Sequence, residues 1–70
     1  MHIRVDNSDQ TDDLLDFLRK AGCIAVRLDE HLLDVHLPDS ISDEAERLEL
    51  GVYVSSWGAR HPEAETKFVG

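Results

Sequence analysis

The chain has 70 residues, 41% of them hydrophobic, and its 15 acidic and 7 basic residues give a net charge of −8. One small domain over residues 1–70 with one thin core is expected, and this much negative charge argues against a nucleic-acid partner. The single cysteine excludes an internal disulfide framework, and together with the four histidines it does not form a zinc-finger spacing. Because these common stabilising links are missing, the sequence favours self-association or a protein partner.

The first residues show no basic segment followed by an apolar one, as a secretion signal would. No apolar run approaches the roughly 20 residues that a membrane-spanning helix needs. We therefore expect a cytoplasmic protein that does not bind membranes.

In chain order, the first elements are a strand over residues 2–6 and a helix over residues 9–21. Ile3 and Val5 point to one side of the strand, and Asn7 or Ser8 suits the start of the helix. The buried stripe of that helix is predicted to be Leu14, Leu15, Leu18 and Ala21, with Phe17 at its margin.

A hairpin follows, with strands over residues 23–28 and 31–37 that end before Pro38. The alternation predicts that the inward-pointing residues are Ile24, Val26, Leu28, Leu33, Val35 and Leu37. A second helix begins at a Ser40 or Ser42 cap and ends around residues 57–60, because Pro62 prevents its continuation.

Residues 1–62 therefore form a β-α-β-β-α body, and residues 63–70 form an edge strand or a loose C-terminal tail. If residues 65–69 are a strand, Thr66 and Phe68 form its inward pair. Right-handed crossovers then give an α+β two-layer sandwich of the ferredoxin-like βαββα(β) type, with strand order 4-1-3-2 and both helices on one face. This fold carries many functions and does not select one.

The second helix is apolar on two sides. At about 100° per residue, one stripe is formed by Ile41, Ala45, Leu48 and Val52. A second set lies elsewhere on the helix and consists of Leu50, Tyr53, Val54 and Trp57. We expect the first stripe to face the sheet and the second set to be the interaction surface. Two alternatives remain open: the C-terminal segment covers Trp57, or the helix is rotated so that its aromatic side is buried.

The sheet face away from the helices holds the other candidates for chemistry, which are His2, Arg4, Asp6, Cys23, Arg27, Asp34, His36, Glu65 and Lys67. Two imidazoles from His2 and His36 with a carboxylate would suit zinc. A solvated face with paired charges is the preferred interpretation, because a flat strand face provides no dry pocket. No cofactor, no metal and no catalytic residue is predicted.

The preferred function is a non-enzymatic interaction and homodimerisation module that uses Leu50, Tyr53, Val54 and Trp57. The alternatives are a small-metabolite-sensing regulatory domain and, less favoured, a metal-binding domain or small enzyme that uses the open sheet face.

Overall fold

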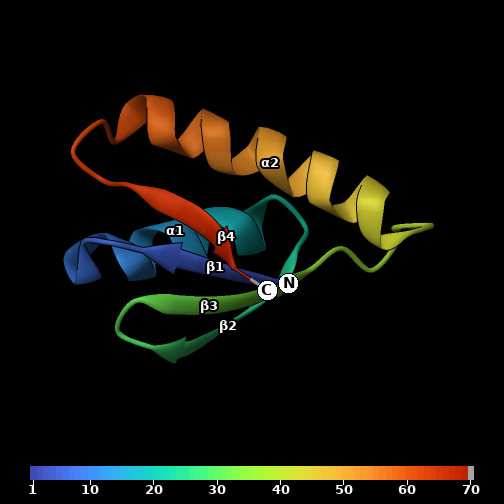
Figure 1. The fold of residues 1–70 in the computed structure, drawn as a ribbon, viewed down its shortest axis with the longest axis horizontal. Helices are drawn as coiled ribbons and strands as arrows, with labels where there is room; N and C mark the ends of the chain where they lie inside the picture. The colour runs from blue at the N-terminus through green and yellow to red at the C-terminus, as the bar shows by residue number, and fades with distance from the viewer. Residues whose placement is uncertain (70) are drawn as a thin grey trace.

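The protein is described by a computed structural model that covers residues 1–69 and forms a four-stranded sheet with two helices (Figure 1). The elements in chain order are β1 (His2–Val5), α1 (Ser8–Lys20), β2 (Ile24–Asp29), β3 (Leu32–His36), α2 (Asp43–Arg60) and β4 (Thr66–Val69). All paired strands are antiparallel, and their order in the sheet is β2-β3-β1-β4. The expected α+β class is confirmed.

The C-terminal segment, for which a strand and a loose tail were both open, forms a strand. β4 pairs with β1, with Ile3 opposite Phe68 and Val5 opposite Thr66. Thr66 and Phe68 are half-buried at this edge of the sheet. Figure 1 accordingly shows β1 and β4 side by side. Gly70, the last residue of the predicted segment, lies outside the described residues.

Both helices begin at a polar cap that the local sequence supplies. The Asn7 side chain accepts a hydrogen bond from the Asp9 N–H at 3.0 Å, and the Ser42 hydroxyl accepts one from the Ala45 N–H at 3.1 Å. These bonds satisfy N–H groups that have no partner within the helix. Of the two predicted caps for α2, Ser42 is therefore the one that is used.

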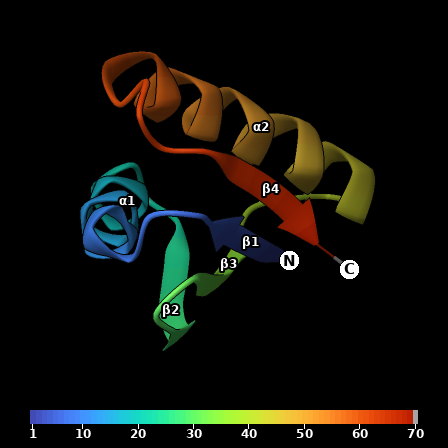
Figure 2. The same cartoon turned by 60° about the vertical axis from the view of Figure 1, so that its left-hand side comes forward.

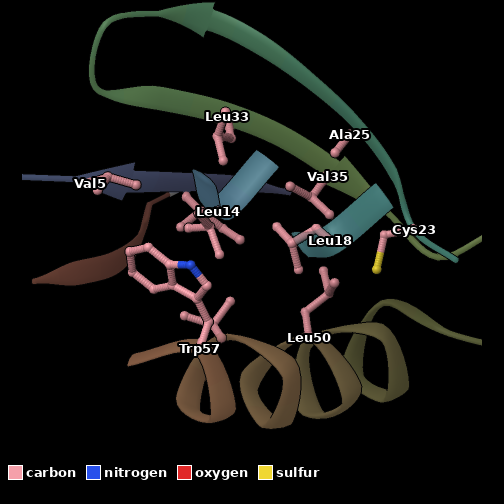
Figure 3. Packing of buried hydrophobic residues seen from close by; sticks show 11 residues of the cluster. Val5, Leu14, Leu18, Cys23, Ala25, Leu33, Val35, Leu50 and Trp57 are labelled. Carbon is pink, nitrogen blue, oxygen red and sulfur yellow. The ribbon is translucent and has the colours of Figure 1, made fainter. Parts of the chain in front are cut away.

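The core is a single cluster between the sheet and both helices (Figure 3). Its members are Ile3, Val5, Leu14, Leu18, Cys23, Ala25, Leu33, Val35, Leu50, Val54 and Trp57. The inward residues predicted for β1 are confirmed, as are Leu33 and Val35 of β3 and Leu14 and Leu18 of α1. Because α1 and α2 both contribute to this one cluster, they cover the same face of the sheet.

The predicted orientation of β2 is wrong. Ile24, Val26 and Leu28 are about half exposed, whereas Cys23 and Ala25 are buried. In Figure 3 the Cys23 side chain points toward the helices, on the side of Leu18. Because the Cys23 and Ala25 side chains are small, α1 can pack closely on β2. The Cys23 N–H donates to the Leu18 carbonyl at 3.0 Å, which joins the start of β2 to the end of α1.

The ends of α1 also differ from the prediction. Ala21, expected in the buried stripe, is the exposed C-terminal cap of the helix. Thr11, by contrast, is fully buried, and its hydroxyl donates to the Glu30 carbonyl at 2.7 Å. This bond ties the start of α1 to the β2–β3 turn and satisfies a polar group in the core.

The predicted inner stripe of α2 is also wrong. Leu50 and Trp57 are at most 1% exposed, whereas Leu48 is 69% exposed and Val52 is 66% exposed. The rotated helix, which was one of the two alternatives, is the observed arrangement. The physical reason is volume, because the indole and the Leu50 side chain fill the space between α2, Leu14 and Leu18 (Figure 3).

This orientation predicts unequal costs for two identical substitutions. We expect Leu50→Ala to lower the free energy of unfolding by about 2–5 kcal/mol, because it leaves a cavity in the core. Leu48→Ala, two residues away on the exposed side, should change it by less than about 0.5 kcal/mol in the monomer. Urea denaturation of both variants at low protein concentration measures the difference. Equal losses would mean that α2 is oriented differently.

Candidate functional site

The four residues predicted to form the interaction surface lie on the inner side of α2. Leu50, Val54 and Trp57 are buried in the core, and Tyr53 is partly buried against it. The prediction that they form an exposed surface is therefore wrong. The Trp57 indole is held by Asp13 of α1, to which its Nε1–H donates at 2.8 Å.

The opposite side of α2 carries the most exposed large apolar residues of the described chain. Ile41, just before the helix, is 94% exposed, and Leu48 and Val52 are 69% and 66% exposed. The stripe continues at the same alternating spacing of four and three residues, through Ile41, Ala45, Leu48, Val52, Ser55 and Ala59. We call these six residues the outer stripe. In Figure 1 no other element lies over the side of α2 that faces away from the sheet.

The charges of α2 are strongly asymmetric along its length. Its first turn contains Asp43, Glu44 and Glu46, and its last turn contains Arg60. Acidic groups at the N-terminus and a cation at the C-terminus both stabilise the helix dipole. The first turn of α2 is therefore negatively charged, and its last turn carries a cation whose guanidinium lies over the Phe17 ring of α1.

A second exposed apolar set lies on the open face of the sheet. Ile24, Val26 and Leu28 of the edge strand β2 are 55%, 49% and 50% exposed. Strand pairing along this edge is hindered, because the Arg19 Nε–H donates to the Ala25 carbonyl at 3.0 Å. The register of β2 on β3 also shifts between Arg27 and Asp29. Ile24, Val26 and Leu28 are less exposed than the large apolar residues of the outer stripe.

The histidines and the aspartate singled out from the sequence do come together on the open face. Asp34 Oδ1 lies 3.7 Å from His2 Nε2 and 3.2 Å from His36 Nε2, and the Met1 ammonium donates to it at 3.4 Å. The Nδ1 of His36 also approaches Glu46 Oε1 at 3.8 Å. Residues 1–69 nevertheless contain no group of three or more side chains arranged to hold a metal ion.

The remaining residues named for this face divide between the two sides of the sheet. Cys23 is buried on the helix side, and Arg27 is half-buried with its guanidinium 2.6 Å from Asp12 Oδ1. Asp6 accepts a hydrogen bond from the Glu65 N–H, which ties β1 to the start of β4. Arg4 and Lys67 stand opposite each other on adjacent strands and are both exposed.

One polar cluster was missed by the sequence analysis. The His61 ring stacks on the Trp57 indole with their centroids 4.2 Å apart, and its Nε2 lies 3.0 Å from Asp13 Oδ2. His61 Nδ1 lies 2.9 Å from the Trp57 carbonyl. The spacing of four residues between Trp57 and His61 is a local signal, but nothing in the sequence indicates that α1 brings Asp13 to them. The cluster fixes the end of α2 to α1.

Comparison with family models, with curated proteins and with solved structures found no match. Within the described residues, neither helix is long and apolar enough to cross a membrane. Among residues 1–69, Ile41, Leu48 and Val52 of the outer stripe are the large apolar side chains that the chain covers least.

The environment of Cys23 predicts an unreactive thiol. Its burial raises the pKa of the thiol, and the nearby Glu46 and Glu49 carboxylates raise it further. Because the thiolate is the reactive form, Ellman's reagent should label folded protein at neutral pH far more slowly than protein unfolded in urea. Cys23 is the only thiol, so the signal is unambiguous. Similar rates in both states would contradict its position in the core.

The surroundings of Asp34 predict a small pH dependence of stability. Partial desolvation raises the pKa of Asp34, but the Met1 ammonium and the His36 and His2 rings outweigh it, so the net pKa is lowered. The stabilisation is therefore present above the unfolded-state pKa of about 4 and is lost as pH falls through the lower folded-state pKa.

Urea denaturation between pH 7 and pH 2.5 tests this with Asp34→Asn. We expect the wild type to be more stable than the variant at pH 7 by less than about 1 kcal/mol, since the ion pairs are solvated. The difference should shrink as the pH falls below about 4, because the Asp34 carboxylate becomes protonated. A difference that grows as the pH falls would show that the sign is wrong.

Proposed function

We propose that this chain is a non-enzymatic module that forms homodimers through the outer stripe of α2. The observation that carries the proposal is the exposure of Ile41, Leu48 and Val52 on a helix whose inner side already fills the core. A helix that is apolar on two opposite sides needs a covering layer on both. The chain supplies one layer, and a second protein surface supplies the other.

The size of the domain supports the same conclusion. With 70 residues and one core cluster, the fold has little apolar area to bury within itself. Covering Leu48 and Val52 removes further apolar surface from water, at about 25 cal/mol per Å². Dimerisation therefore stabilises a domain that has no disulfide among its described residues.

We further infer that the fold is the ferredoxin-like sandwich and that the module acts in the cytoplasm. The alternation β-α-β-β-α-β and the sheet order β2-β3-β1-β4 support the first inference. A free, buried Cys23 suits the second, since cytosolic proteins keep their thiols reduced.

Sedimentation equilibrium at micromolar concentrations tests the dimer. We expect the wild type to have twice the chain mass of 7.9 kDa. Leu48→Glu should weaken the association at least tenfold, because it places a carboxylate in the apolar contact. Both proteins should give the same circular dichroism spectrum, because Leu48 lies outside the core.

Val26→Glu is the matched control, since it puts the same charge on the other exposed apolar set. This variant should dimerise as the wild type does. A monomeric wild type would contradict the proposal. Dissociation by Val26→Glu in place of Leu48→Glu would move the interface to the open sheet face and contradict the proposal equally.

A further inference from the structure

We propose that the second copy lays its α2 antiparallel on the first, about a twofold axis, with Leu48 of each copy opposite Val52 of the other. This inference rests on the proposed homodimer and specifies its geometry. A twofold interface must be complementary to itself, because the same patch is contributed by both subunits. The outer stripe meets this requirement only when the two α2 helices are antiparallel.

The six positions of the outer stripe have the same spacing from either end of the stripe. In an antiparallel pairing centred on residue 50, the opposed positions are Ile41 with Ala59, Ala45 with Ser55, and Leu48 with Val52. The large Ile41 then meets the small Ala59 at each end, and Leu48 packs on Val52 at the centre, which suits interdigitated packing. A parallel pairing would place Ile41 against Ile41 at one end and Ala59 against Ala59 at the other, and the helices would splay.

The charges of α2 favour the same direction. The exposed charged residues of the segment 43–49 are three acidic and one basic, a net of 1 − 3 = −2, whereas residues 50–60 carry only the charge of Arg60, or +1. The Glu46 carboxylate lies on the inner side of α2, where it accepts the Leu37 N–H. Antiparallel pairing sets each acidic half against a weakly basic half. Parallel pairing sets a net charge of −2 against another of −2 and also aligns the two helix dipoles, and both effects are unfavourable.

The surface around the stripe leaves room for a second helix. A Cβ atom added at Gly51 or Gly58 would meet nothing within 4 Å, so the flank next to the stripe is open in the monomer. With 18 residues, α2 is about 27 Å long. Figure 2 shows α2 along one side of the molecule, with β2 on the far side. A second copy therefore approaches without contacting the open sheet face.

Cysteine cross-linking of the 70-residue chain distinguishes the antiparallel from the parallel pairing. Ala45→Cys and Ser55→Cys are small changes within the outer stripe. A short bismaleimide is added to three samples: each variant by itself, and an equimolar mixture of the two variants. In the antiparallel dimer, position 45 of one copy faces position 55 of the other. The two copies of position 45 are then about 15 Å apart along the helix axis, because ten residues separate 45 from 55.

We expect a covalent dimer in the mixture and little from either variant alone, with the wild type as control because Cys23 is buried. Sedimentation of each variant first shows that it still dimerises. Cross-linking of Ala45→Cys with itself would establish a parallel pair and overturn this inference, although the homodimer would stand. A dimer that cross-links in no combination would also overturn it, whereas a monomer in sedimentation would remove the homodimer itself.

Discussion

A helix packed on one layer can bury only one side, and α2 has two apolar sides that point in opposite directions. The chain covers the side with Leu50 and Trp57 and leaves Leu48 and Val52 in water. The side of α2 that faces the sheet determines the core, because the sheet and α1 pack around the side chains that α2 inserts. It also determines the surface, because the opposite side, with Leu48 and Val52, becomes the largest exposed apolar feature of the helix.

The polar contacts of α2 explain why the helix adopts this rotation. Asp13 accepts the indole N–H of Trp57 at 2.8 Å, so the buried tryptophan has its hydrogen bond. Glu46 accepts the Leu37 N–H at 3.1 Å near the other end of the helix. Turning α2 to bury Leu48 would break both bonds and bring Trp57 into water. The rotation is therefore determined by tertiary contacts at both ends of the helix.

The sequence predicted the elements well and the faces less well. Strict alternation in β1 and the one-sided stripe of α1 identified Ile3, Val5, Leu14 and Leu18 as core residues, since each pattern has a single apolar side. In β2 and α2 both sides are apolar, and periodicity does not rank them. There the outcome depended on volume: the small Ala25 fits beneath α1, and the large Trp57 fills the space under α2.

The cluster of Asp13, Trp57 and His61 was beyond sequence analysis because Asp13 is 44 residues away from Trp57 in the chain. The candidate surface was found only in part. Two apolar sides on one helix indicated a partner, but the exposed side is the outer stripe.

The most direct test of the two-sided helix is a dilution series followed by methyl NMR. The account predicts concentration-dependent shifts for the methyl groups of Ile41, Leu48 and Val52, with those of Leu50 and Val54 nearly unchanged. The core methyl groups keep their neighbours when the dimer dissociates, whereas the outer ones become exposed to water. Shifts confined to Ile24, Val26 and Leu28, or spectra that do not change with concentration, would contradict it.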